Sequence, residues 1–302
     1  MSATERVAVL RGGPSAEREV SLRSGAAVAR ALAALGHEVF EVDPEPGRLR
    51  LPLRTTVAFL ALHGTYGEDG QVQSELEALG IPYTGCGVEA SRRAFDKVLT
   101  REACRAAGVP VARGHVFAEP TAAWPPGWRP PVVLKPARQG SSVGLQFVEG
   151  ADGLADALRE SFRHGSEVLM EERIVGRETT VGILDGVALP VVEVRPRSGA
   201  YDYRNKYTPG ATEYFCPAVL GPEVTGAVQG AALGAFHAIG GRDYARVDVM
   251  VTGDGRPVVL EVNTLPGMTE TSLMPKAAAA AGLDFGALCL RLVTMALERR
   301  RA

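Results

Sequence analysis

The chain has 302 residues, which is enough for about two domains at roughly 150 residues each. Hydrophobic residues make up 46% of it and charged residues 23%, a globular composition that excludes a disordered protein. The 33 basic residues nearly balance the 35 acidic ones, so no basic field indicates a nucleic-acid partner.

The two basic residue types are unevenly represented. Four of the 33 basic residues are lysines and the other 29 are arginines. Because arginine serves here as the routine surface cation, each lysine is a candidate for specific chemistry. The four are Lys97, Lys135, Lys206 and Lys276.

The sequence indicates neither an export signal nor a membrane segment. Charged residues interrupt the short apolar run within residues 1–13, and the alanine tract 277–281 is far too short to span a bilayer. The four cysteines have no C-x-x-C spacing and no nearby histidine, so we expect reduced, mostly buried thiols. These features predict a cytoplasmic protein that does not engage a membrane.

The first part of the chain alternates unbroken apolar strands with helical or loop segments. We expect a strand at 7–10, a turn at 11–15, a helix over 20–35, and strands at 38–42 and 57–62. Strands buried on both faces that alternate with helices indicate a parallel α/β sheet. This first domain is predicted to comprise residues 1–96.

From Lys97 onward the pattern changes to strands around a glycine-rich loop. We expect helices at 97–107 and 151–162, strands at 111–116 and 167–172, and a strand–loop–strand unit at 132–148. The remainder predicts strands at 178–184, 187–195, 244–251 and 257–262, a long loop at 197–211, and helices at 223–239 and 285–300. The predicted fold class is therefore α/β, with α+β character in the C-terminal part, divided into domains 97–178 and 179–302 after the first.

A candidate metal site lies on the hairpin formed by the last two strands. Asp254-Gly255 favours a two-residue type I′ turn. With these two as the central pair, Asp248 faces Glu261 and Arg246 faces Asn263, and alternation places all four on one face. The interspersed valines then face a core.

Two carboxylates placed opposite each other, with Cβ atoms about 5 Å apart, repel unless a cation lies between them. Mg²⁺ is usually held by one or two carboxylates, with phosphates and waters completing the octahedron. The alternative is an exposed strand face with one salt bridge, from Arg246 to Glu261, and a spare carboxylate. Gly253 could also lengthen the turn and shift the register by one residue.

The loop within residues 132–144 is a candidate phosphate site. Its glycines allow backbone N–H groups to approach phosphate oxygens, Ser141 and Ser142 supply hydroxyl groups, and Lys135 supplies a charge after an apolar strand. It is not a P-loop, and Gly12-Gly13 does not match the dinucleotide fingerprint, which excludes a Rossmann-type dehydrogenase. The alternative is an ordinary Gly/Ser hairpin loop.

Other candidates follow strands of the first domain or lie in later loops. Glu17 could bind a substrate ammonium group, or it could be a first-turn acid of a helix capped by Ser15. His63 lies at the same sheet edge, where a structural histidine is the alternative. The tyrosine-rich loop 200–207 is either a lid or a surface loop, and the irregular segment 265–273 could present N–H groups to an oxyanion.

Taken together and in order, these segments resemble the D-alanine–D-alanine ligases of the ATP-grasp superfamily. The resemblance covers nearly the whole chain. The motifs that carry it are Gly12–Ser21, Ala61–Gly64, Pro82–Gly85, Asp96-Lys97, Gly140–Gly144, Tyr201–Tyr203, Lys206-Tyr207, Arg246–Asp248 and Glu261–Thr269.

The resemblance implies an ATP-dependent ligation of two D-alanines through a D-alanyl phosphate, for peptidoglycan precursor synthesis in a homodimeric enzyme. It implies nucleotide binding by Lys97, Lys135, Ser142, Glu171 (adenine), Glu178 (ribose) and Lys206. It implies two Mg²⁺ ions, which Mn²⁺ can replace, on Asp248, Glu261 and Asn263.

For the substrates, the resemblance implies a Glu17–Ser141–Tyr207 set with His63 nearby, an oxyanion hole of Arg246 and Gly267, and a second-carboxylate site at Ser272 and Leu273. The alternatives are a D-alanine–D-lactate ligase, another ATP-grasp carboxylate–amine ligase, and a noncatalytic nucleotide-binding protein that kept the fold.

Overall fold

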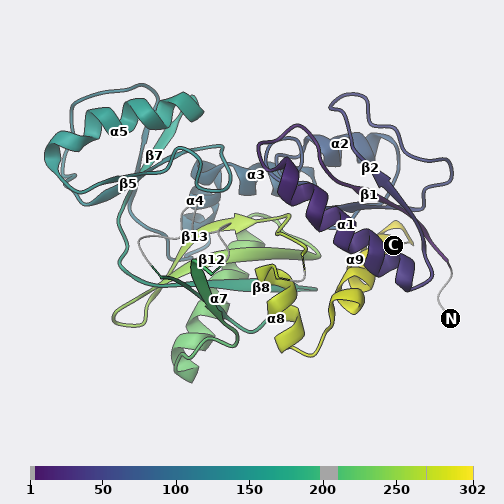
Figure 1. Cartoon of the computed structure of the whole chain (residues 1–302). Coiled ribbons are helices and arrows are strands. Elements are labelled where there is room, and N and C mark those ends of the chain that lie inside the picture. The colour runs from purple at the N-terminus through teal and green to yellow at the C-terminus, as the bar shows by residue number, and fades with distance from the viewer. Residues whose placement is uncertain (1–3, 198–209, 270, 302) are drawn as a thin grey trace.

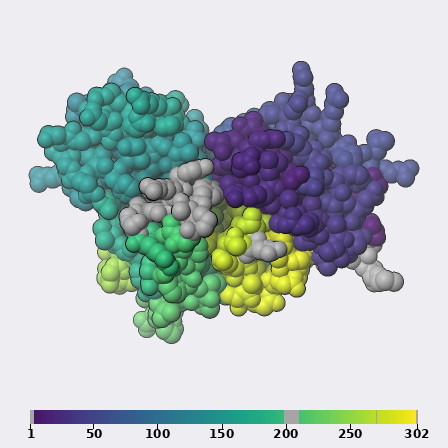
Figure 2. All heavy atoms as spheres, in the orientation of Figure 1, coloured from purple at the N-terminus to yellow at the C-terminus, as the bar shows by residue number. Residues whose placement is uncertain are grey.

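The computed structural model describes residues 4–197, 210–269 and 271–301 (Figure 1). Lys206 and Tyr207, which the sequence places in the nucleotide and substrate sites, lie outside these residues. In Figures 1 and 2 the middle part of the chain (teal) and the N-terminal part (purple) lie side by side above the last part.

The N-terminal part is built on a parallel sheet in the order β2-β1-β3. Its strands are almost fully apolar, because helices cover them: Val7 to Leu10 and Val57 to Leu60 are all buried. The elements are β1 (Arg6–Leu10), α1 (Arg18–Ala34), β2 (Glu38–Val42), β3 (Val57–Leu60), α2 (Gln71–Ala78) and α3 (Val88–Phe95).

The middle part is an antiparallel sheet in the order β4-β7-β5-β6, covered by α5. Leu134, Leu158 and Met170 form part of its own small core. The elements are α4 (Lys97–Ala106), β4 (Gly114–Phe117), β5 (Val132–Pro136), β6 (Gln146–Val148), the short helix η1 (Ala151–Gly153), α5 (Leu154–Ser161), η2 (Phe162–His164) and β7 (Val168–Glu172).

The last part is an antiparallel sheet in the order β11-β10-β8-β12-β13, with β9 paired to β8. Along the chain, helix α7 lies between β11 and β12, and helices α8 and α9 follow β13. The elements are β8 (Gly176–Leu184), β9 (Val187–Ala188), β10 (Val192–Pro196), β11 (Thr212–Phe215), α7 (Pro222–Ala238), β12 (Tyr244–Thr252), β13 (Pro257–Asn263), α8 (Leu273–Ala280) and α9 (Phe285–Arg301).

Helix α9 returns to the N-terminal part, where it packs against α1 and β3. One hydrophobic core therefore joins β1 and β3 to Leu288, Leu292 and Val293. The division of the chain after residues 96 and 178 stays a prediction.

No single helix among the residues described is long and apolar enough to cross a membrane; the helix pair α8 and α9 passes on length and composition, with a bend of 101° between them.

Candidate active site

Two adjoining cavities, of about 840 and 740 Å³, lie between the three parts of the chain. Lys97, Gln139 and Glu261 line both, so the cavities meet at these residues. Every site residue predicted from the sequence and described by the structure lines at least one of them. The first is lined by Lys97, Lys135, Ser142, Glu171, Glu178, Asp248 and Glu261; the second by Glu17, His63, Lys97, Ser141, Arg246, Glu261, Asn263, Gly267, Ser272 and Leu273.

The β12–β13 hairpin brings Asp248 opposite Glu261 and Arg246 opposite Asn263, as predicted. The predicted two-residue turn is wrong, however. The Thr252 N–H donates to the Arg256 carbonyl oxygen at 3.0 Å, and the Arg256 N–H donates to Thr252 Oγ1 at 3.1 Å, so the loop between them has three residues, 253–255. Its last residue has a φ of 83°, the left-handed conformation that such loops require and glycine provides.

A β-bulge restores the register at the site. The longer turn shifts the pairing by one residue, so that Val249 faces Val259, and the shift is undone before Asp248 faces Glu261. Leu260 is the extra residue that absorbs it. The predicted opposition of the carboxylates therefore holds although its predicted cause, the two-residue turn, does not.

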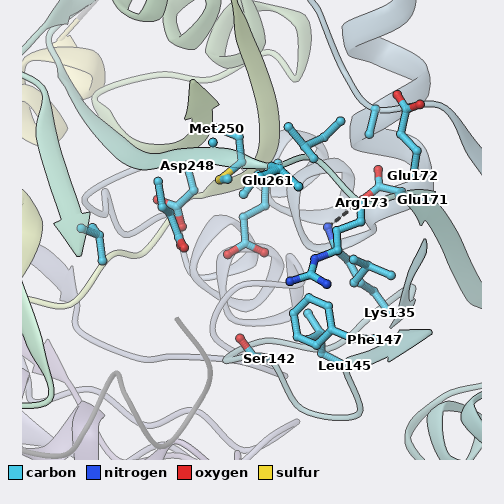
Figure 3. Close-up of a pocket in the computed structure, with 18 of the residues that line it drawn as sticks. Lys135, Ser142, Leu145, Phe147, Glu171, Glu172, Arg173, Asp248, Met250 and Glu261 are labelled. Carbon is cyan, nitrogen blue, oxygen red and sulfur yellow. Dashed lines mark hydrogen bonds and ion pairs between the residues drawn. The ribbon is translucent and has the colours of Figure 1, made fainter. Parts of the chain in front are cut away.

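Asp248 is held by two side chains from the same sheet. Arg246 donates to both of its oxygens, from Nε and Nη2 at 2.9 Å each, and Thr180 Oγ1 donates to Oδ1 at 2.6 Å. The salt bridge considered in the sequence analysis, Arg246 to Glu261, is therefore replaced by one to Asp248. Glu261, on the opposing strand, lines both cavities, and Figure 3 shows it in the first.

The oxygen donors of Asp248, Glu261 and Asn263 suit a hard cation. Within the described residues there is no cluster of three or more His, Cys, Asp or Glu side chains arranged to hold a metal. Two carboxylates and an amide are, however, the donor set expected for Mg²⁺ that binds together with phosphate oxygens. Asn263 Oδ1 also accepts the Leu265 N–H at 3.0 Å, which orients the amide oxygen.

Lys135 and Glu171 form a buried ion pair at the back of the first cavity (Figure 3). Lys135 Nζ lies 2.6 Å from Glu171 Oε2, and Arg101 Nε lies 3.7 Å from Oε1. Burial alone would lower the pKa of the Lys135 ammonium, but the charge of Glu171 and its hydrogen bond leave that pKa raised. Lys135 is therefore charged at neutral pH.

The walls of the first cavity are apolar where a flat ring could lie. Phe147 on β6, Met250 on β12 and the bulged Leu260 all line it, and the guanidinium carbon of Arg173 lies 5.1 Å from the centre of the Phe147 ring. Phe147 is 42% exposed. Such an apolar slot beside a lysine and two carboxylates suits a nucleotide.

The glycine-rich loop reaches across to the N-terminal part. Ser141 and Ser142 have φ values of 48° and 60°, in the left-handed region that only a tight loop imposes on serine. Ser141 Oγ donates to Glu17 Oε1, and a side chain at Gly140 would lie 2.8 Å from Glu17 Oε2. A side chain at Gly140 would therefore displace the Glu17 carboxylate. Ser15 is not the helix cap considered earlier, because Glu17 takes that position.

Two buried titratable groups line the second cavity near Glu17. Burial lowers the pKa of His63, which is therefore neutral at pH 7. Burial, reinforced by the charge of Glu17, raises the pKa of Glu68 well above its usual value. Glu68 accepts the Gly64 N–H at 3.1 Å. The sequence analysis did not select Glu68, although it lies five residues after His63 in the same loop.

The segment between β13 and α8 folds tightly around Ser272. Its hydroxyl lies 2.7 Å from Thr269 Oγ1 and accepts the Thr269 N–H at 3.1 Å, and a side chain at Gly267 would approach it to 2.9 Å. Ser272 is the N-cap of α8 and Leu273 its first residue, so helix N–H groups face the second cavity there.

Two family models match the chain: "D-ala D-ala ligase N-terminus" over residues 41–86 and "D-ala D-ala ligase C-terminus" over residues 125–294. A D-alanine–D-alanine ligase of Methylacidiphilum infernorum is 46% identical over 296 residues, which cover 98% of this chain and 97% of that protein. One from Syntrophotalea carbinolica is 49% identical over 302 residues, with the same coverage. The chain belongs to the D-alanine–D-alanine ligase family.

Solved structures agree with this family. A D-alanine–D-alanine ligase from Bacillus anthracis superposes with a TM-score of 0.85 at 35% identity, covering 99% of both chains. A structure of a D-alanine–D-alanine ligase from Bacillus anthracis complexed with ATP gives 0.84 at 32% identity, again over 99% of both chains. The predicted α/β fold of the ATP-grasp type is therefore confirmed.

Within this ligase fold, Lys276 is a cavity residue that the sequence analysis noted only for the rarity of lysine. It lies on α8, one turn after Ser272, and lines the second cavity. Its Nζ lies 5.9 Å from the centre of the Tyr214 ring. None of the described carboxylates lies within salt-bridge distance of it. The unusual lysine count was the signal that could have selected it.

Proposed function

We propose that the chain joins two D-alanine molecules to D-alanyl-D-alanine: the γ-phosphoryl group of ATP passes to the carboxylate of the first D-alanine, and phosphate leaves this D-alanyl phosphate when the amine of the second attacks. The observation that carries this proposal is the junction of the two cavities at Lys97 and Glu261. A nucleotide in the first cavity would direct its terminal phosphate at that junction. A carboxylate in the second cavity would then be in line to attack it.

In the first cavity the chain's own residues bind and orient the nucleotide. Phe147, Met250 and Leu260 offer the apolar slot for adenine, with Glu178 for the ribose. Lys135 and Lys97 bring positive charge to the phosphates, and Ser142 offers a hydroxyl. Glu171, which also lines this cavity, holds Lys135 in place and would contact the adenine.

We propose that Asp248, Glu261 and Asn263 hold Mg²⁺, with Mn²⁺ able to replace it. The all-oxygen donor set supports this, as does the enforced closeness of two carboxylates on paired strands. The ions, when bound, would neutralise charge that develops on the transferred phosphoryl group.

In the second cavity, Glu17 would accept the ammonium group of the first D-alanine, in a position fixed by Ser141. Arg246 and the N–H of Gly267 would face the carbonyl oxygen when the second amine attacks. The N–H groups at Ser272 and Leu273 would hold the second carboxylate. Most of the rate enhancement would come from positioning and from fixed charges in a closed site.

The decisive assay is ADP formation by the purified chain with D-alanine, with L-alanine, and with D-alanine plus D-lactate. We expect activity with D-alanine alone and none with L-alanine. Phosphate release at neutral pH with D-alanine plus D-lactate, but not with D-alanine alone, would instead assign a depsipeptide ligase. No ADP formation with any pair would remove the ligase proposal.

The setting of the enzyme is part of the same proposal. We propose that its product serves peptidoglycan precursor synthesis and that the enzyme is cytoplasmic. We also propose a homodimer, which sedimentation of the purified chain tests directly.

A further inference from the structure

Three buried hydrogen bonds connect helix α1 to the segment that carries Gly267. His63 Nδ1 lies 2.9 Å from the carbonyl oxygen of Leu265. His63 Nε2 lies 3.4 Å from Ser24 Oγ, and Ser24 Oγ accepts the N–H of Met268 at 3.3 Å. These bonds form a path from Leu265 through His63 and Ser24 to Met268, so they link the two ends of the segment 265–268.

The direction of every bond in this path is fixed by its two ends. A carbonyl oxygen only accepts, so His63 carries its proton on Nδ1. The ring is neutral, because burial lowers its pKa, and Nε2 therefore accepts the Ser24 hydroxyl proton. Ser24 Oγ then accepts from the Met268 N–H, which can only donate. Each ring nitrogen of His63 thus makes one hydrogen bond, and Ser24 Oγ makes two, one as donor and one as acceptor.

The path encloses the residue whose backbone N–H the reaction needs. Leu265 and Met268 flank Pro266 and Gly267, and both are 1% exposed. Ser24 is completely buried and belongs to α1, 244 residues away from Met268 in the sequence. Both ring nitrogens of His63 are engaged, which leaves its ring no free atom for the substrate.

We propose that Ser24 and His63 are positioning residues that clamp the segment 265–268 and so aim the N–H of Gly267 at the reacting carbonyl. This rests on the function proposed above. His63 then acts on the substrate through the segment instead of touching it. The two bonds of Ser24 are long, as hydrogen bonds that support a reaction commonly are before substrate binds, and they would shorten in the complex.

The test compares Ser24→Ala with Ser91→Ala. Ser91 is also a completely buried helical serine, on α3, but its hydroxyl has no hydrogen-bond partner among the described residues, and it lines neither cavity. We expect Ser24→Ala to lower kcat by about 10- to 100-fold, the scale of a small misplacement of a catalytic group, with the KM for ATP unchanged. Ser91→Ala should retain the parent kcat.

Two further measurements separate positioning from a general loss of structure. A phosphinate dipeptide, whose tetrahedral oxyanion would face Gly267, should lose affinity for Ser24→Ala by the same factor as kcat, while the product dipeptide does not. Ser24→Thr, which keeps the hydroxyl, should recover part of the rate. If Ser24→Ala does not fold, His63→Gln gives the same comparison.

The inference is overturned if Ser24→Ala keeps the parent kcat, or if phosphinate and product lose affinity equally. Failure of the parent chain to form ADP with D-alanine would instead remove the proposed function, so the two failures are distinguishable.

Discussion

Arg246 grips both carboxylate oxygens of Asp248, two residues further along the same strand, through a pair of parallel hydrogen bonds of 2.9 Å. Both side chains are mostly buried, at 14% and 12% exposed. The proposed carbonyl-binding cation and the proposed metal ligand are therefore one unit. A change to either side chain disturbs the other.

Replacement of Arg246 by lysine should abolish this paired contact while it keeps the charge. We expect kcat to fall by about 10²- to 10³-fold, the usual loss when one oxyanion donor is removed. Arg18→Lys is the matched control, because Arg18 grips Asp43 in the same way and lines neither cavity. A kcat for Arg246→Lys within threefold of the parent would contradict the assignment.

Glu261→Gln should remove one negative charge with little change in shape. If Glu261 holds the metal, ADP formation should fall by about 10³-fold, and the Mg²⁺ concentration for half-maximal activity should rise. Glu149→Gln is the control, since Glu149 lines the nucleotide cavity but pairs with Arg173 and is 62% exposed. Activity that survives Glu261→Gln would show that the metal site is wrong.

Glu171→Ala should destabilise the fold as well as the nucleotide site. It would leave Lys135 and Arg101, at 14% and 13% exposed, without their carboxylate. Loss of one partner of a buried pair costs about 3 kcal/mol in the free energy of unfolding. Urea denaturation measures this directly. Glu171→Gln, which can still accept a hydrogen bond, should lose less; equal losses would mean that the charge of Glu171, and not its hydrogen bond, stabilises this cluster.

Glu68 should make the stability of the chain depend on pH. Its pKa is raised in the folded state, so folding takes up a proton above the usual carboxyl pKa of about 4.3. In the folded chain Glu68 is most stable when protonated. Its contribution to the free energy of unfolding is therefore fully present below that pH, and it is lost as the pH rises through the pKa of the folded state. Glu68→Gln should therefore become progressively more stable than the parent from pH 4.5 upward. The free energy of unfolding of each protein, measured at several pH values, tests this. A difference between the two proteins that stays constant across this range would contradict the prediction.

Lys276→Met should weaken binding at the second-substrate site. The lysine adds positive charge to the end of the cavity where Ser272 and Leu273 lie. A hydrogen bond or ion pair to a charged group contributes about 1.5 kcal/mol or more, so the KM of the second D-alanine should rise about tenfold, with the KM for ATP unchanged. Arg256→Met, which removes an exposed cation at the hairpin turn, should change neither. Equal changes in both constants would exclude a role at this site.

The sequence predicted the parts of the site that depend on local pattern. Strand alternation placed Asp248 and Glu261 on one face because hydrophobic burial on the other face fixes the register. The length of the turn and the bulge at Leu260 escaped prediction, because each is a one-residue irregularity whose effect on the register is cancelled by the other.

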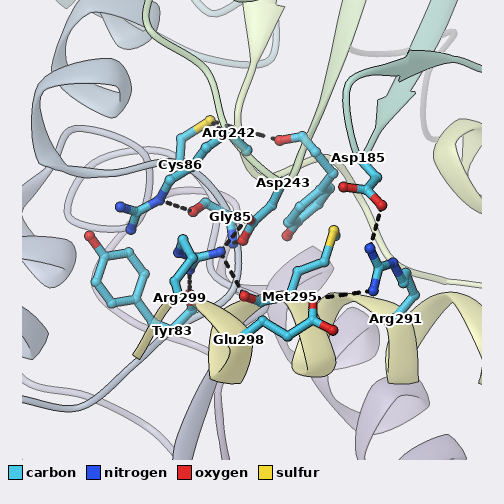
Figure 4. A network of polar contacts seen from close by, with 11 residues as sticks. Tyr83, Gly85, Cys86, Asp185, Arg242, Asp243, Arg291, Met295, Glu298 and Arg299 are labelled. Atoms are coloured by element: carbon cyan, nitrogen blue, oxygen red, sulfur yellow. Dashed lines mark hydrogen bonds and ion pairs between the residues drawn. The ribbon is translucent and has the colours of Figure 1, made fainter. Parts of the chain in front are cut away.

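Contacts between distant segments could not be predicted from the sequence pattern. Arg101 reaches Glu171 from a helix 70 residues earlier, and no local sequence pattern predicts that these two residues pair. The same holds for Arg299 on α9, which pairs with the buried Asp243 and donates to the carbonyl oxygen of Tyr83 at 2.6 Å (Figure 4). Such contacts depend on how whole elements pack, and single-chain periodicity carries no information about that.

All three lysines that the structure describes, Lys97, Lys135 and Lys276, line the two cavities. In most proteins amine acylation marks the surface indiscriminately, because lysines are spread over it. Here the surface cations are arginines, which such reagents leave untouched. Mass-spectrometric mapping of acetylated lysines would therefore act as a footprint of the ligand sites, in which each bound molecule is recognised by the amine that it shields.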